Sequence, residues 1–151
     1  MRTINKQPKK PFFIVSAFKG DAEERGLLRS EIHRSIKLEQ ELKAMKLPFK
    51  TLIGSWKGQT ELSYLVTTDT VKEAHSYGRA FADAYNQEAF VVVDSDRNGQ
   101  CMITKYDKDY NYGSYEGTNL GKLVLTDKKL IGDDWSRCPM TDKYYTFNGG
   151  E

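Results

Sequence analysis

Residues 56–66 read Trp56-Lys57-Gly58-Gln59-Thr60-Glu61-Leu62-Ser63-Tyr64-Leu65-Val66. The stretch predicts a hairpin turn around Lys57-Gly58-Gln59 that leads into an apolar strand. Because successive strand residues face opposite sides of a sheet, Glu61 and Ser63 are expected on one face and Tyr64 on the other. A carboxylate at the start of a strand, close to Trp56 and Tyr64, suits a small cationic ligand. The alternative is a solvated glutamate on an exposed strand face.

Strands and helices alternate on both sides of this hairpin. The uninterrupted apolar run Phe12–Phe18 predicts a buried strand, and the hairpin strands are expected at Phe49–Ser55 and Glu61–Thr67. A run apolar on both faces predicts a central strand at Ala89–Asp94. A turn at Ser95–Gly99 then leads to a returning strand, Gln100–Tyr106.

Two helices are expected between these strands. Asp21 and Glu24 resemble a capping box for a helix within Asp21–Lys46, and Thr70-Val71-Lys72-Glu73 is a clear capping box for the second. Apolar residues at helical spacing predict one buried stripe on each helix. The first stripe comprises Leu28, Ile32, Ile36, Leu38, Leu42 and Met45, and the second comprises Ala74, Tyr77, Phe81, Ala84 and Tyr85.

The predicted order is βαββαβ followed by one more strand, an α+β pattern. It is typical of the ferredoxin-like fold, an antiparallel sheet with two helices on one face. The other face of such a sheet must be covered or solvated, and oligomer formation is a common way to cover it. The tyrosine-rich segment Tyr106–Gly117 is expected to be a loop whose tyrosines pack locally or across an interface. Short strands are expected at Lys122–Thr126 and Lys143–Phe147.

The bulk composition indicates a single globular domain, residues 11–151, behind a flexible basic arm, residues 1–10. A net charge of +2 argues against nucleic acid, and the apolar run behind the arm is too short to span a membrane. Two distant cysteines, Cys101 and Cys138, indicate a reducing cytoplasm. The sequence lacks zinc-ligand spacing, a phosphate-binding glycine loop and a Ser/His/Asp arrangement, so neither a metal nor a cofactor is expected.

Over residues 11–105 the chain resembles the small phage-encoded enzymes that degrade S-adenosylmethionine, formerly called hydrolases and now understood as lyases. The first strand ends Val15-Ser16-Ala17-Phe18 before a basic residue, as in that family. Gly54-Ser55-Trp56-Lys57 is similar to the family's glycine, small, aromatic and basic residues, and the spacing from Glu61 to Gln87 fits without gaps. The order and spacing of these stretches carry the resemblance.

The resemblance implies a trimer of ferredoxin-like subunits, similar to the PII signalling proteins, with ligand sites between subunits. It implies conversion of S-adenosylmethionine to 5′-methylthioadenosine and homoserine lactone, which would deplete a methyl donor that some host restriction systems need. Glu61 and Gln87 match the family's functional positions. Glu61 is expected to hold the substrate's ammonium or sulfonium charge, and Gln87 to support it by hydrogen bonding.

The substrate pocket is expected to use the backbone of Ser16, Ala17 and Phe18 for the adenosine, with Ser63 beside Glu61 and with Trp56 and Tyr64 as aromatic walls. The chain departs from the family at Trp56, where tyrosine is expected, and throughout its tyrosine-rich tail. Three other functions remain open at this point. They are a hydrolase that yields homoserine, a non-catalytic PII-like module that binds a small molecule, and an inhibitor of a host protein that acts through Tyr110, Tyr112 and Tyr115.

Overall fold

The computed structural model describes residues 9–17, 28–56, 59–85, 87–106, 113–126, 135–138 and 143–147. Within them lie eight strands and two helices. In chain order these are β1 (Phe12–Ser16), α1 (Leu28–Ala44), β2 (Phe49–Trp56), β3 (Gln59–Thr67), α2 (Val71–Ala84), β4 (Ala89–Val93), β5 (Asn98–Tyr106), β6 (Gly113–Thr126), β7 (Trp135–Cys138) and β8 (Lys143–Phe147).

The strands form one closed antiparallel barrel in the order β1-β3-β2-β7-β8-β6-β5-β4. The mixed α+β class is therefore confirmed, and β1 lies between β3 and β4 as a central strand. The ferredoxin-like topology is not confirmed, because the antiparallel sheet curls and closes on itself. The long strand β6 continues the sheet from β5, and the β7–β8 pair joins β6 to β2, so the sheet curls until its two edges meet.

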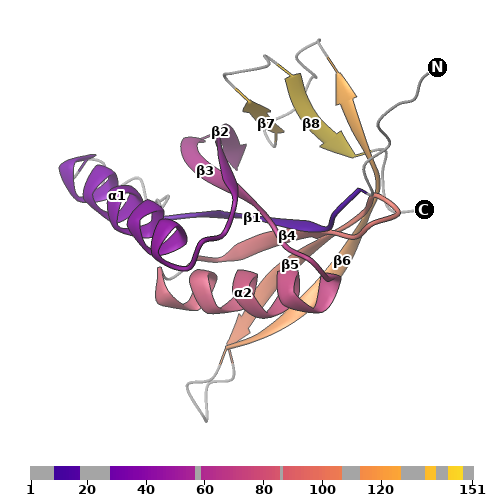
Figure 1. Ribbon diagram of the computed structural model, residues 1–151, viewed down its shortest axis with the longest axis horizontal. Helices are drawn as coiled ribbons and strands as arrows, with labels where there is room; N and C mark the ends of the chain where they lie inside the picture. The colour runs from indigo at the N-terminus through magenta and orange to yellow at the C-terminus, as the bar shows by residue number, and fades with distance from the viewer. Residues whose placement is uncertain are drawn as a thin grey trace.

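The curled sheet has a separate apolar cluster on each side. On one side the helices pack against β1, β3 and β4 through residues that include Phe13, Tyr64 and Phe81. Inside the barrel, Phe12, Leu65 and their neighbours meet side chains of β6 and β8. Figure 1 shows β7 and β8 on the opposite side of β1 from α2. The C-terminal strands thus cover within one chain the sheet face for which an oligomer was considered.

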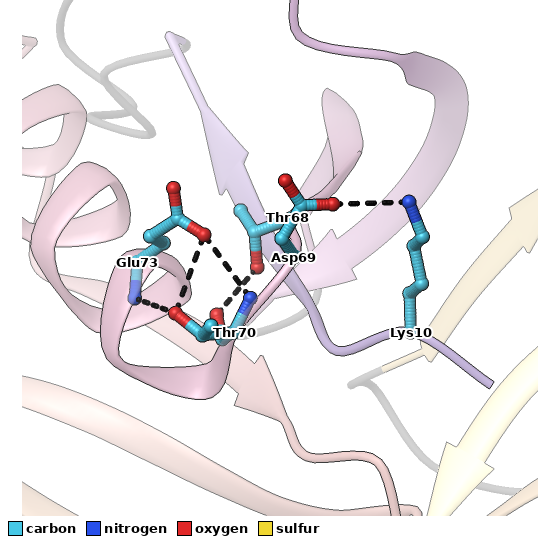
Figure 2. A network of polar contacts seen from close by, with 5 residues as sticks. All are labelled: Lys10, Thr68, Asp69, Thr70 and Glu73. Carbon is cyan, nitrogen blue, oxygen red and sulfur yellow. Dashed lines mark hydrogen bonds and ion pairs between the residues drawn. The ribbon is translucent and has the colours of Figure 1, made fainter. Parts of the chain in front are cut away.

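The second helix begins as the sequence predicts. The Thr70 hydroxyl accepts a hydrogen bond from the Glu73 amide (3.1 Å), and the Glu73 carboxylate accepts one from the Thr70 amide (3.1 Å) (Figure 2). Beside this capping box, Lys10 pairs with Asp69 at 3.0 Å on the surface. Ala84 of the predicted stripe is exposed, and Gly78 and Ala82 are buried in its place.

The predicted stripe of the first helix is wrong in part. Leu38 and Leu42 are fully buried, but Ile32 and Ile36 are 49% and 50% exposed, and Met45 is exposed as well. Positions 36 and 38 differ by about 200° around a helix, so they cannot share one face. The buried face of α1 instead includes Ser35 and half-buried charged residues. The Asp21–Glu24 capping box lies outside the described residues.

The C-terminal third is more regular than expected. Residues 113–117, predicted as part of a loop, belong to β6, and so does the predicted short strand at 122–126. The strand at Lys143–Phe147 is confirmed, whereas β7 was not predicted from the sequence. Tyr115 packs locally, with its hydroxyl donating to Asp83 on α2 (2.6 Å). Tyr110 and Tyr112 lie outside the described residues. No helix among the described residues is long and apolar enough to cross a membrane.

Candidate functional site

Several of the predicted site positions lie near the C-terminal end of β1. In the register of the sheet, Ser16 pairs with Ser63 of β3, and Glu61 lies two positions earlier on the same strand, opposite Gly54. On the other side of β1, Ile14 pairs with Val91 of β4. Gln87 precedes β4, so it too lies toward this end of β1. The antiparallel pairing thus brings together positions that are 71 residues apart in the sequence, from Ser16 to Gln87.

Two serines mark the barrel-facing side of this end. By strand alternation, Ser16 shares its face with Phe12 and Ile14, and Ser63 shares its face with Leu65. Both serines are buried, and the Ser16 hydroxyl donates to the Leu62 carbonyl at 2.6 Å. The buried Ser63 hydroxyl has no hydrogen-bond partner within the described part of the chain. Because a buried hydroxyl without a partner is costly, it is suited to a polar group of a bound molecule or to water.

The helix-facing side of this end is organised by Arg34 of α1. Its Nε donates to the Ala17 carbonyl at 2.7 Å, and its Nη2 donates to the Tyr85 carbonyl. The Tyr85 carbonyl also accepts from the Gln87 side-chain amide at 3.1 Å. Gln87 is only 8% exposed, and its backbone amide donates to the Ala82 carbonyl at 2.8 Å. Ala17 and Gln87, two predicted site residues, are therefore linked through Arg34 and the Tyr85 carbonyl.

Tyr85 itself is held to α1 at its far end. Its hydroxyl donates to the Glu41 carboxylate at 2.5 Å, while the Arg34 guanidinium lies over its ring, 5.7 Å from the ring centroid. Burial is the main cause that raises the pKa of Tyr85, and the hydrogen bond and negative charge of Glu41 add to it, against the opposing charge of Arg34. The phenol is therefore protonated at neutral pH and acts as a donor.

Tyr64 lies apart from the serine pair. It is 1% exposed within the core under the helices, and its ring packs edge-on against Phe49. Its hydroxyl contacts Glu39 Oε2 at 3.2 Å, and burial, followed by this carboxylate, raises the pKa of Tyr64. Position 64 belongs to the sheet face opposite positions 61 and 63, so the predicted alternation of this strand holds.

Three predicted site residues lie partly or wholly outside the described part of the chain. Phe18 lies outside the described residues, and the side chains of Glu61 and Trp56 lie outside the described side chains, although both residues belong to strands. The described groups near the end of β1 are hydroxyls, main-chain carbonyls, an amide and a guanidinium. They can bind and orient a polar ligand. In the described part of the chain, no group of three His, Cys, Asp or Glu residues could hold a metal ion.

Sequence reasoning missed Arg34, Glu41 and the structural role of Tyr85. The signal was present: Arg34, Leu38 and Glu41 are spaced i, i+4 and i+7, which places them on one helix face. The more apolar series Ile32–Ile36 lies on a different face of the same helix and gives the stronger hydrophobic pattern.

Comparison with known families gives one result. A family model described as the S-adenosylmethionine lyase family matches residues 13–150, nearly the whole chain. The match includes every residue assigned above to the end of β1, and it continues through the C-terminal strands. A comparison with curated proteins finds none that matches.

Proposed function

This chain belongs to the S-adenosylmethionine lyase family and is a lyase that acts on S-adenosylmethionine; on that premise we propose that it forms 5′-methylthioadenosine and L-homoserine lactone. The substrate carboxylate bonds to its own γ-carbon while the bond from that carbon to sulfur breaks. The electron pair leaves with sulfur, which converts the sulfonium to a neutral thioether. No proton is transferred, and the net charge of the reactants equals that of the products.

Such a reaction places few demands on the protein. The sulfonium is already a good leaving group and the nucleophile is part of the substrate, so the site must mainly fold the methionine arm into a reactive geometry. Fixed charges and dipoles that match the transition state complete the requirement. A hydrolase needs in addition a group to activate water, and the sequence offers no dedicated base.

The observation that carries the site assignment is the register at the end of β1. Ser16 pairs with Ser63, Glu61 lies two positions from Ser63, and Gln87 is tied to Ala17 through Arg34. We assign Glu61 to the substrate's ammonium or sulfonium charge and Gln87 to hydrogen-bonded support of that group. The unpartnered Ser63 hydroxyl is available for a polar substrate atom.

The adenosine pocket is proposed to lie along the backbone of Ser16, Ala17 and Phe18, with Trp56 as an aromatic wall. Tyr64 is assigned no substrate contact, because it is enclosed in the core and lies on the opposite face of β3.

The reaction is tested by following purified protein and S-adenosylmethionine by NMR. Methylthioadenosine and homoserine lactone are expected to appear together, with homoserine only later as the lactone hydrolyses. Homoserine as the first product would replace the lyase mechanism with hydrolysis. If substrate remains unchanged, the protein is a binding module or an inhibitor.

The role of Glu61 is tested by Glu61→Gln, which keeps the shape of the side chain and removes its charge. The turnover rate is expected to fall at least about 100-fold, because electrostatic groups aimed at the reacting centre contribute on that scale. Glu116→Gln is the matched control: Glu116 is exposed on β6, and its removal is expected to leave the rate unchanged. Full activity in a folded Glu61→Gln protein would refute the assignment.

We further propose a homotrimer with sites between subunits, acting in the host cytoplasm during phage infection to deplete the methyl donor used by restriction systems. The exposed side chains of Ile32 and Ile36 form an apolar surface on α1 that another subunit can contact. Light scattering of the purified protein gives the oligomeric state. Plating of unmodified phage on a restricting host that expresses this chain tests the biological role.

A further inference from the structure

Tyr85 is held from three sides at the end of α2. Arg34 lies over its ring and donates to its carbonyl, Glu41 accepts from its hydroxyl, and Gln87 donates to the same carbonyl. Arg34 and Glu41 lie on one face of α1, seven residues apart. A single helix therefore binds both the main-chain carbonyl and the side-chain hydroxyl of Tyr85. Tyr85 in turn is two residues from Gln87.

Arg34 also reaches the second strand end of the candidate site. Its Nε donates to the Ala17 carbonyl at 2.7 Å, directly after β1. A guanidinium has a rigid, planar set of donors, so the two carbonyls that it binds are fixed relative to each other. One side chain thereby sets the separation between the end of β1 and the segment that carries Gln87.

We propose that Arg34 is a positioning residue for the lyase reaction, acting through Tyr85 to hold Gln87 and through Ala17 to hold the end of β1. The expected effect on the reaction rate rests on the proposed function. The expected effect on the position of Gln87 rests on the hydrogen-bond geometry alone. Arg34 itself is assigned no contact with substrate, since the described donors of its guanidinium bind main-chain carbonyls.

Arg79 provides a matched control for the loss of an arginine beside a tyrosine. It lies on α2 with its guanidinium 5.5 Å from the centroid of the Tyr115 ring, and it forms an exposed ion pair with Asp83 at 3.9 Å. It therefore repeats the arginine–tyrosine contact of Arg34 with a different tyrosine, one that lies on β6. Replacing Arg79 tests whether the loss of any arginine charge and its contact with a tyrosine ring changes activity as much as the loss of Arg34.

The experiment compares Arg34→Met, Arg34→Lys and Arg79→Met by two measurements. The first is kcat and KM for S-adenosylmethionine. The second is the side-chain amide signal of Gln87, assigned with Gln87→Glu, together with hydrogen exchange at the Gln87 backbone amide, which donates to Ala82. Arg34→Lys is included because it keeps the charge but not the planar fork, and it remains informative if Arg34→Met does not fold.

For both Arg34 variants we expect kcat to fall about 10- to 100-fold with KM changed less than about threefold, because misplacement of a reacting geometry by a fraction of an ångström acts on the chemical step. The Gln87 signals are expected to shift and its amide to exchange faster. Arg79→Met is expected to leave both measurements as in the unmodified protein.

Three results would overturn the inference. They are unchanged Gln87 signals in the Arg34 variants, a KM effect with unchanged kcat, which would make Arg34 a binding contact, and an equal response from Arg79→Met. If the unmodified protein does not consume S-adenosylmethionine, the proposed reaction fails. The Gln87 measurements then decide the positioning role by themselves.

Discussion

The packing of the last strand, β8, over β5 can be tested at Gly99. A Cβ atom placed on Gly99 would lie 2.3 Å from Cε1 and 2.8 Å from Cδ1 of Phe147 on β8. Phe147 packs against the cluster inside the barrel, so the ring must move if residue 99 carries a side chain. Gly99→Ala is therefore a direct probe of whether the Phe147 ring of β8 packs over β5 as described.

The expected cost follows from two opposing effects. Forcing an extra methyl group into a packed interior typically costs about 1–3 kcal/mol. Replacing glycine by alanine at an unstrained backbone position stabilises by about 0.4–1 kcal/mol through the unfolded chain. We therefore expect Gly99→Ala to lower the free energy of unfolding by about 1–2 kcal/mol. For a domain of this size that corresponds to a fall in Tm of roughly 2–8 °C.

The measurement is a double-mutant cycle by urea denaturation with Phe147→Ala. Once the ring is removed, the alanine at position 99 has room, so its cost is expected to disappear in the double variant. The resulting coupling between the two sites is expected to be about 1–3 kcal/mol, within the range seen for residues in contact. The slope of the unfolding free energy against urea should stay constant, so that midpoints report stability.

Gly117→Ala is the control on the neighbouring strand. Its added Cβ would lie 3.2 Å from the sulfur of Met102, a flexible side chain that can move aside. Its effect is expected to be near zero or slightly stabilising. Equal stability of Gly99→Ala and the unmodified protein, or strictly additive effects of Gly99→Ala and Phe147→Ala, would refute the described approach of β8 to β5.

Two further predictions concern the helices. Thr70→Ala removes the capping box of α2 and is expected to lower the free energy of unfolding by about 1 kcal/mol, measured by thermal or urea unfolding. Asp69→Ala removes only the exposed ion pair with Lys10 and is expected to leave that free energy almost unchanged. Equal losses of stability in the two variants would contradict the capping role. The folded pKa of Tyr85 lies above its ordinary value of 10.0, so the unfolded chain releases the proton first and stability falls as pH rises above 10. In Tyr85→Phe the slope of the unfolding free energy against pH above 10 should be less steep, by the equivalent of about one proton. An unchanged slope would show that the buried phenol does not contribute.

Local patterns in the sequence determined much of the framework. The capping box at Thr70 needs only residues three positions apart, and it forms as predicted. The alternation from Leu62 to Val66 follows from strand geometry, and it correctly separates Ser63 from Tyr64. Family membership was also visible in the order and spacing of short segments, and it agrees with the family match over residues 13–150.

Tertiary structure decided what depends on contacts between distant segments. The buried face of α1 carries Leu38 and Leu42 in the core, together with the Arg34 and Glu41 contacts to Tyr85, whereas the apolar series Ile32–Ile36 is exposed. Closure of the sheet depends on β7 and β8 bridging β2 and β6, strands that begin more than 60 residues apart. Hydrophobic periodicity reports which side chains prefer burial, but the partner that buries them is chosen by packing across the whole chain.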